Sequence, residues 1–440
     1  MDPRVTTPTP GDTAWFTNDR FGLFIHWGIY SLGARREWLR HRERLSIEDY
    51  NRRYFEHFDP DLFDPAAWAR AAGAAGMKYF VVTTKHHDGF CLWDSAHTEY
   101  KAPNTPCGRD LLRPLLDAFR DEGLKVGLYH SLIDWHHPDY TLDWTHPMRD
   151  NEKYRAAEDT RRIERYTAYL HAQVEELLSN YGTIDILWFD FSPDDRRGFA
   201  GKGREEWQSE KLIALARRLQ PGILINDRLR IDQDIKTPEQ LVPREWVRVD
   251  GKPVVWEACH TVAGAWGYDR DGSRWKSTTQ LISLLIECVS KGGNLLLNVG
   301  PTGRGEIDER SLERLEGIGR WMHRHGRSVY GCTQAPACFP CPPGCLLTFN
   351  AAKNRLYIHV LNWPCGMLHL PGTAPLAEYA QLLHDASEIP MLTEEVTEEA
   401  ADPQNEVRSA ELLSLKLPAE KPDTAVPVIE LFLKDRDDEK

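Results

Sequence analysis

The stretch that decides the fold is Tyr79-Phe80-Val81-Val82-Thr83-Thr84-Lys85-His86-His87-Asp88-Gly89-Phe90. Its first six residues are aromatic or β-branched, which is typical of a buried strand. Two adjacent histidines follow where this strand is expected to end. In α/β proteins, titratable side chains at such a strand end indicate an active site, because packing alone does not require them there.

Apolar runs of the same kind alternate with helix-like segments from residue 21 to about residue 330. This alternation indicates βαβ units around a parallel sheet, and seven runs approach the eight strands of an irregular, TIM-type (β/α)8-like barrel. The connection from Arg228 to Pro253 looks irregular. The predicted strands are Phe21 to Trp27, Lys78 to Lys85, Lys125 to Ser131, Asp185 to Asp190, Gly222 to Asp227, Val254 to His260 and Asn294 to Val299. The predicted helices are Pro65 to Ala75, Asp110 to Glu122, Asp159 to Asn180, Glu205 to Leu219, Thr278 to Lys291 and Asp308 to His325.

The pattern of residue types along the chain changes at about Ser328. Pro- and Cys-rich turns are followed by alternating runs such as Arg355 to Trp363 and Ala425 to Leu433, which favour antiparallel strands. We therefore expect a catalytic (β/α) barrel domain over residues 1–327 and a C-terminal antiparallel β-sandwich domain over residues 328–440.

Composition and charge limit the classes of function. The 440 residues are 41% hydrophobic and carry a net charge of -13, and no stripe of Lys and Arg is present, which argues against a nucleic-acid partner. No run reaches the roughly 18 apolar residues of a membrane span. Nine cysteines and an N-terminus without an apolar core indicate the cytoplasm. The sequence leaves open whether the chain forms a homo-oligomer.

Four of the cysteines cluster near the start of the C-terminal domain. Only Cys338 and Cys341 show the two-residue gap of a zinc site, so we expect no metal in the segment from Cys332 to Cys345, and its role stays open.

Polar side chains recur at the ends of successive predicted strands. In a barrel these ends meet at one mouth, and so many polar groups together indicate a ligand. They are His26, His86, His87, the segment Tyr129 to Ser131, Asp190, Asp227, Arg228, Glu257 and His260.

Asp190 closes the apolar run Ile184 to Phe191, and Trp188 lies two positions earlier. Residues two apart on a strand share a face, so ring and carboxylate are expected to point together into the mouth. This arrangement suits a nucleophilic carboxylate next to an aromatic side chain that lines the site. A helix cap or an ion pair is the structural alternative for Asp190. A glycosidase also needs a second, protonated carboxyl group, and spacing alone does not choose among Asp88, Glu239 and Glu257.

At this point the sequence resembles glycoside hydrolase family 29, the retaining α-L-fucosidases. The matching segments run in the family's order from about residue 15 to residue 325. They are Trp15-Phe16, Phe21 to Gly28, Glu37-Trp38, Thr84 to Phe90, Gly127 to Ser131, Leu187 to Asp190, Ile225 to Arg228, Trp256-Glu257, Trp266 to Tyr268 and Gly292 to Pro301.

The resemblance implies a role for each matched residue. Asp190 aligns with the nucleophile that carries the covalent fucosyl intermediate, and Arg228 could stabilise it as an anion. Histidines and Glu37 can bond the sugar hydroxyls, and tryptophans can pack on the ring and the C5 methyl group. No cofactor is expected. The implied fucose pocket is His26, Glu37, Trp38, His86, His87, Tyr129, Trp188, Arg228 and Trp266.

The general acid/base is the hardest residue to place. In one branch of the family it lies in a Lys-Thr-x-Glu segment, about a dozen residues after an Asn-Asp-Arg motif. Lys236-Thr237-Pro238-Glu239 matches that segment, and its distance from Asn226-Asp227-Arg228 is one residue shorter than in that branch. We therefore predict Glu239 as the general acid/base, with Glu257 as the second candidate. The structural alternative is that Glu239 sits on a solvated loop.

The expected function is that of a retaining exo-glycosidase of carbohydrate metabolism, which releases L-fucose from fucosylated oligosaccharides or glycoconjugates. The sequence does not determine the preferred linkage or leaving group. One alternative is a metal-dependent barrel hydrolase that uses His26, His86, His87 and Asp190, although adjacent histidines on a strand point to opposite sides. Another is a fucose-binding protein without catalysis, against which the two carboxyl groups argue.

Overall fold

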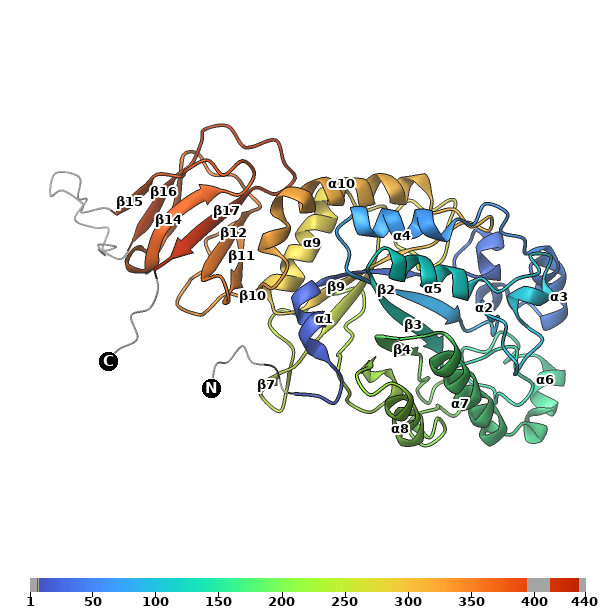
Figure 1. Ribbon diagram of the computed structural model, residues 1–440. Coiled ribbons are helices and arrows are strands. Elements are labelled where there is room, and N and C mark those ends of the chain that lie inside the picture. Colours follow the sequence, from blue (N-terminus) through green and yellow to red (C-terminus); the bar gives the residue numbers. More distant parts are fainter. Residues whose placement is uncertain (1–5, 7, 394–411, 435–440) are drawn as a thin grey trace.

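The computed structural model describes residues 6, 8–393 and 412–434. Its central feature is a parallel sheet of seven strands in the order β5-β4-β3-β2-β1-β9-β8 (Figure 1). Each strand falls within or beside one of the seven predicted runs, so the predicted parallel sheet is confirmed. The strands are β1 (Phe21–Ile25), β2 (Tyr79–Lys85), β3 (Lys125–Ser131), β4 (Ile186–Asp190), β5 (Leu224–Ile225), β8 (Glu257–Thr261) and β9 (Asn294–Val299).

An irregular segment from Ile235 to Glu239 fills the eighth position of the barrel. It makes parallel bridges to both edges of the sheet, from Ile235 to Asn226 beyond β5 and from Glu239 to Cys259 of β8. Pro238 interrupts it, and because proline has no N–H to donate, the segment cannot form a regular strand. The connection predicted as irregular therefore closes the (β/α)8-like barrel. It also contains a small hairpin of β6 (Arg248–Val249) and β7 (Lys252–Pro253).

Six longer helices cover the outside of the barrel, and all six were predicted (Figure 1). In α5 the buried residues Leu112, Leu115, Leu116 and Phe119 show the spacing that predicts an amphipathic helix. The short helices α1 (Thr13–Asp19), α2 (Leu39–Glu43), α3 (Ile47–Arg53) and α6 (Glu152–Ala156) were missed, because one or two turns are too few for a periodic pattern. The six are α4 (Pro65–Ala74), α5 (Leu112–Asp121), α7 (Ile163–Asn180), α8 (Ser209–Leu219), α9 (Thr278–Ser290) and α10 (Glu309–His325).

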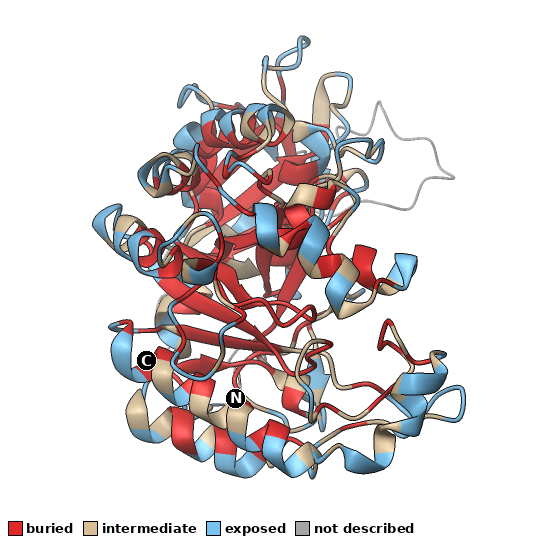
Figure 2. Ribbon diagram, turned by 90° about the vertical axis from the view of Figure 1, so that its right-hand side faces the viewer, coloured by how far each residue is buried: buried red, intermediate tan, exposed pale blue. Residues whose placement is uncertain are grey.

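The barrel strands are buried on both faces. Alternate residues of β2 belong to two different cores: Tyr79 and Val81 lie inside the barrel, and Phe80 and Val82 pack against the helices. Figure 2 shows buried strands at the centre and exposed residues on the outer faces of the helices. No helix within the described ranges is long and apolar enough to span a membrane.

The C-terminal part is an antiparallel β-sandwich, as predicted. Its two sheets share one hydrophobic core, with Leu347 and Ile358 from one sheet and Leu370 and Leu415 from the other. The change from the parallel to the antiparallel sheets falls between α10 and β10. The first sheet contains β10 (Thr333–Gln334), β11 (Cys345–Asn350), β12 (Arg355–Val360), β17 (Val428–Leu433) and β14 (Ala377–Leu382), and the second contains β13 (Met367–Leu370), β16 (Leu413–Lys416) and β15 (Met391–Thr393).

Candidate active site

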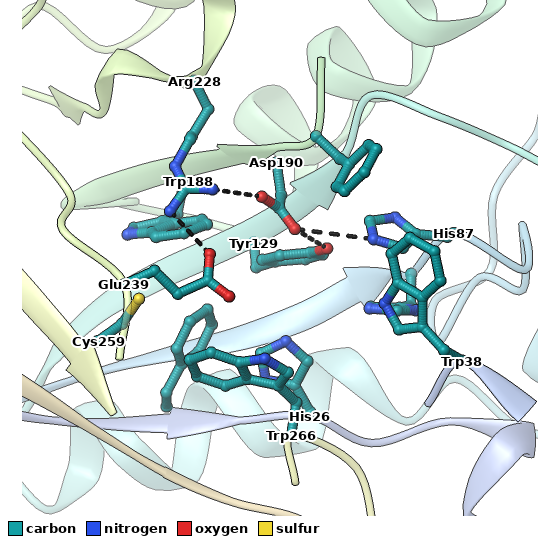
Figure 3. Close-up of a pocket in the computed structure, with 13 residues that line it drawn as sticks. His26, Trp38, His87, Tyr129, Trp188, Asp190, Arg228, Glu239, Cys259 and Trp266 are labelled. Carbon is teal, nitrogen blue, oxygen red and sulfur yellow. Dashed lines mark hydrogen bonds and ion pairs between the residues drawn. The ribbon is translucent and has the colours of Figure 1, made fainter. Parts of the chain in front are cut away.

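A pocket of about 120 Å³ opens at the mouth of the barrel, where the carboxyl ends of the parallel strands converge (Figure 3). The structure brings ten of the eleven predicted site residues into its wall, all except Glu37. The lining residues are Phe24, His26, Trp38, His86, His87, Tyr129, Trp188, Asp190, Phe191, Arg228, Glu239, Cys259 and Trp266.

Glu37 lies behind the pocket wall and is buried. Its Oε2 accepts a hydrogen bond of 2.8 Å from the backbone N–H of Gly267, and burial raises the pKa of Glu37. The side chain thus anchors the loop that carries Trp266. Glu37 shapes the pocket in this structure by holding that loop.

Three lining residues were not predicted: Phe24, Phe191 and Cys259. Phe24 precedes His26 by two positions on one strand face, and this period of two could have revealed it. Cys259 follows Glu257 in the same way. Phe191 has a φ of 71°, a left-handed conformation that is uncommon outside glycine. No local pattern in the sequence predicts that its side chain lines the pocket.

Asp190 stands at the end of β4, where its backbone is paired with Ser131 of β3. The Tyr129 hydroxyl donates to Oδ2 at 2.8 Å, and Nη1 of Arg228 donates to Oδ1 at 3.2 Å. Burial raises the pKa of Asp190 to about 6, a rise that Arg228 opposes and Glu239 supports. Asp190 is therefore a carboxylate at neutral pH with two donors that fix its orientation.

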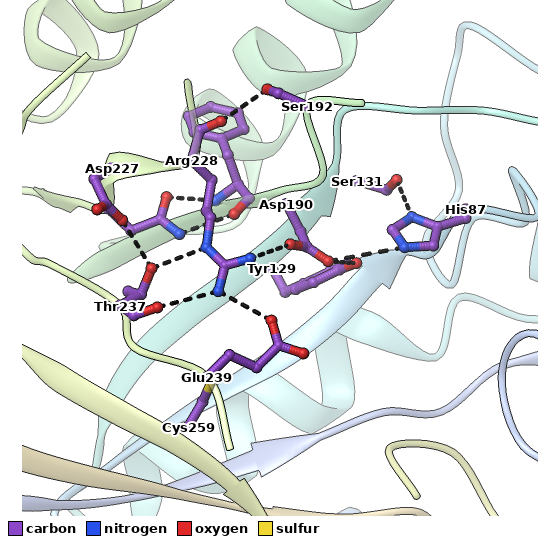
Figure 4. A network of polar contacts seen from close by, with 12 residues as sticks. His87, Tyr129, Ser131, Asp190, Ser192, Asp227, Arg228, Thr237, Glu239 and Cys259 are labelled. Carbon is purple, nitrogen blue, oxygen red and sulfur yellow. Dashed lines mark hydrogen bonds and ion pairs between the residues drawn. The ribbon is translucent and has the colours of Figure 1, made fainter. Parts of the chain in front are cut away.

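Arg228 joins the two predicted catalytic carboxyl groups (Figure 4). Its Nη2 donates to Oε2 of Glu239 at 3.1 Å while Nη1 holds Asp190. Thr237 accepts from the same guanidinium through its hydroxyl and its carbonyl oxygen, at 3.0 and 3.1 Å. The guanidinium also lies over the Trp188 ring, 5.0 Å from its centroid. These contacts hold Arg228 in one position and place both carboxyl groups on neighbouring nitrogens.

Glu239 reaches the pocket from the irregular segment that closes the barrel. Its side chain is 43% exposed, so a substrate oxygen and water can both approach it. The bridge to Cys259 fixes the backbone at this point, and the salt bridge to Arg228 fixes the carboxyl group. Glu239 is thus positioned by the barrel itself, in contrast to the solvated loop considered as an alternative.

Glu257 occupies a different environment. It is fully buried and does not line the pocket, since it lies two residues before Cys259 on β8, about 7 Å deeper in the barrel. Tyr79 donates to its Oε2 at 2.5 Å, and burial raises the pKa of Glu257 to about 8. At neutral pH it is a protonated acid inside the barrel core.

The histidines of the pocket are neutral, and two of their tautomers follow from the hydrogen-bond network. The Ser131 hydroxyl donates to the carbonyl of Ile133, so it accepts from Nδ1–H of His87 at 2.7 Å. In the same way Nδ1–H of His26 donates to Oδ1 of Asn298 at 2.6 Å. Burial lowers the pKa of His26 to about 3 and that of His87 well below its usual value. His26 therefore keeps Nε2 as an acceptor for a ligand hydroxyl, whereas Nε2 of His87 lies 3.8 Å from Oδ2 of Asp190.

One expectation about the adjacent histidines, concerning the directions in which they point, is not met. The argument that they point to opposite sides of a strand is wrong, because β2 ends at Lys85 and both His86 and His87 line the pocket. Within the described residues, no group of three or more His, Cys, Asp or Glu side chains is arranged to hold a metal ion. All nine cysteines, including those from Cys332 to Cys345, are free thiols.

A (β/α)8-like barrel whose mouth carries an ionised aspartate, a second carboxyl group, hydroxyl acceptors and aromatic rings defines a barrel glycoside hydrolase. The model of the family described as alpha-L-fucosidase matches residues 7–327. The chain belongs to the α-L-fucosidase family.

Individual relatives agree. The chain is similar to α-L-fucosidase isoenzyme 1 from Paenibacillus thiaminolyticus, with 46% identity, a TM-score of 0.88 and coverage of 96% of this chain and 99% of that one. Mouse tissue α-L-fucosidase is 30% identical over 80% of this chain and 78% of its own length. A structure of a GH29 α-L-fucosidase from Bacteroides thetaiotaomicron, trapped as a covalent intermediate with 2-fluoro-fucosyl fluoride, is 27% identical with a TM-score of 0.81 and covers 98% of this chain and 99% of that one.

Proposed function

We propose that this chain hydrolyses terminal α-L-fucosyl linkages by double displacement, with Asp190 as nucleophile and Glu239 as general acid/base. The observation that carries the proposal is that one guanidinium, that of Arg228, binds both carboxyl groups in the wall of one pocket. Such an arrangement favours the short separation of about 5 Å found in retaining enzymes over the wider spacing of inverting ones.

The pocket supplies matching groups for the sugar. Nε2 of His26 can accept from a ring hydroxyl, and Nε2 of His87 lies beside Asp190, 3.8 Å from its Oδ2; ring hydroxyls must regain hydrogen bonds when they leave water. Trp188, Trp266 and Phe24 form an apolar wall for the ring face and the C5 methyl group. This combination supports a deoxy sugar with one apolar edge as the ligand.

In the first step, the carboxylate of Asp190 attacks the anomeric carbon while Glu239 donates its proton to the departing oxygen. The bond from carbon to the leaving group breaks as the ester to Asp190 forms. Tyr129 and Arg228 hold the attacking carboxylate so that its free lone pair faces the sugar. Its pKa of about 6 keeps it ionised at neutral pH.

In the second step, Glu239 takes a proton from water, and the resulting hydroxide attacks the same carbon and releases Asp190. Once Asp190 is an ester it carries no charge, so Arg228 remains paired with Glu239 alone. That pairing holds the Glu239 carboxyl group in place beside the site where water attacks.

The nucleophile is tested with Asp190→Gly. We expect kcat on an aryl α-L-fucoside to fall by about 10⁴-fold or more, because the covalent step is lost. Azide should restore turnover by entering the space left by the carboxylate, with β-L-fucosyl azide as the product. Asp61→Gly, which removes an exposed carboxylate paired with Arg304, is the matched control and should keep full activity. Full activity in Asp190→Gly would exclude this nucleophile.

We also propose a reducing compartment such as the cytoplasm as the site of action. The support is that all nine cysteines are free, several of them on the surface.

A further inference from the structure

A second hollow, which we call the outer groove, adjoins the fucose pocket. It has a volume of about 370 Å³ and is lined by Trp144, the segment from Phe191 to Asp194, and residues around Arg228 and Arg230. Phe191 and Arg228 belong to the walls of both cavities. The groove therefore begins one side chain away from the two carboxyl groups that act on the scissile bond.

Thr237 ties the groove to the proposed acid. It lies two positions before Glu239 on the segment that closes the barrel, and both residues contact the guanidinium of Arg228. Figure 4 shows Ser192 at the backbone of Arg228, and Thr237, Asp190 and Glu239 around its guanidinium. A leaving group whose oxygen is protonated by Glu239 can thus extend past Arg228 into this groove.

Aromatic rings continue from one cavity into the other. The Phe191 ring lies 5.4 Å from that of Trp38 in the fucose pocket and 6.1 Å from that of Trp144 in the groove. The left-handed backbone of Phe191, directly after the nucleophile, is the kind of strain that accumulates at ligand sites. The indole N–H of Trp144 is buried without a hydrogen-bond partner, and the guanidinium of Arg196 lies over one side of the Trp144 ring, 4.6 Å from its centroid.

The charges of the groove select the class of ligand. Two carboxylates, Asp194 and Asp227, are balanced by two guanidiniums, Arg228 and Arg230. Asp194 and Arg230 form an exposed ion pair, and Arg230 also donates to the carbonyl of Ser192 at 2.8 Å. A balanced pair of donors and acceptors beside aromatic rings suits a neutral, hydroxyl-rich ring.

We propose that the outer groove is the leaving-group subsite and binds a neutral pyranose residue of the fucosylated substrate against Trp144. This inference rests on the proposed function. It gives the chain a preference for fucosyl oligosaccharides whose second sugar carries no charge.

The test compares substrates with and without a second ring. In Trp144→Ala, kcat/KM for the best of four neutral α1,2-, α1,3-, α1,4- and α1,6-linked fucosyl disaccharides should fall about 10- to 100-fold, because the stacking surface is removed. Turnover of α-L-fucosyl fluoride, whose leaving group has no ring, should stay within about twofold. Trp144→Phe, which keeps an aromatic ring, should recover most of the loss. Trp363→Ala, in the C-terminal sandwich, is the matched control and should change neither substrate.

Two results would overturn the subsite: equal losses on the fluoride and the disaccharides, or no loss on either. A wild-type protein that cleaves neither substrate would instead refute the proposed function, so the two failures can be told apart.

Discussion

Glu239 and Glu257 lie on neighbouring parallel segments of one barrel, yet they belong to two different regions of the molecule. Glu239 is at the mouth, partly exposed and bonded to Arg228, whereas Glu257 is in the core below, fully buried and bonded to Tyr79. Each lies in a segment that matches a sequence motif of the family, Glu239 in Lys236 to Glu239 and Glu257 in Trp256-Glu257. The difference shows that depth in the barrel decides what a carboxyl group can do.

The physical reason is the cost of burying charge. At the mouth, water and the guanidinium of Arg228 can stabilise a carboxylate, so a proton can be given up and taken back. In the core, an isolated carboxylate would lose its hydration, and the neutral acid is favoured instead. Glu257 is therefore a neutral hydrogen-bonding group shielded from the pocket, whereas Glu239 is open to water and to a ligand.

Of the two glutamates, Glu239 should give the larger effect when its carboxyl group is removed. In Glu239→Ala, kcat/KM for fucosyl disaccharides should fall about 10³-fold, because the departing oxygen is no longer protonated. α-L-Fucosyl fluoride needs little help from an acid and should lose less than about tenfold. Steady-state kinetics on the two substrates measures this difference.

The matched control is Glu257→Gln, which keeps the size and the Tyr79 contact of the deeper side chain. It should retain activity on disaccharides to within about tenfold. A selective loss on disaccharides in Glu257→Gln, with Glu239→Ala active, would reverse the assignment of the two glutamates.

A smaller effect concerns stability. The pKa of Glu257 is about 8 in the folded protein against an ordinary value of 4.5. Between these pH values the folded protein holds a proton that the unfolded chain has released, so raising the pH favours unfolding, by about 1.4 kcal/mol per unit. Glu257→Gln removes this contribution. Between pH 5 and pH 8, wild type should lose roughly 3 to 4 kcal/mol more free energy of unfolding than the variant.

Urea unfolding of both proteins at the two pH values measures this difference. Other titrating groups cancel in the comparison because they are common to both chains. If the free energy of unfolding changed equally with pH in wild type and variant, Glu257 would be ionised in the folded protein.

The smallest effect is on the pH dependence of the nucleophile. For α-L-fucosyl fluoride, kcat/KM should decline below about pH 6, because Asp190 becomes protonated there. In Glu239→Gln this decline should move to lower pH, because the charge of Glu239 raises the pKa of Asp190. An unchanged profile would show that the two carboxyl groups are not coupled through this site.

Much of the barrel could be predicted because its signals are local. Runs such as Lys125 to Ser131 and Asn294 to Val299 match β3 and β9 residue for residue, since strands buried on both faces are almost continuously apolar. The segment from Ile235 to Glu239 could not be recognised as part of the barrel. It contains Lys236, Thr237 and Pro238, and it is held by backbone bridges to distant residues that leave no periodic pattern.

The sequence by itself determined the class of fold, the position of Asp190 at a strand end and ten of the thirteen residues that line the pocket. Polarity and spacing along the chain indicate His26, His86, His87, Tyr129, Trp188, Asp190 and Arg228, whereas Trp38, Glu239 and Trp266 were assigned through the resemblance to glycoside hydrolase family 29. Only the tertiary structure decided which glutamate reaches the mouth, that Arg228 joins the two carboxyl groups, and that Phe191 leads into an outer groove beside Trp144. Each of these depends on burial and on contacts between segments far apart in the chain, and neither quantity is encoded in any local pattern of residues.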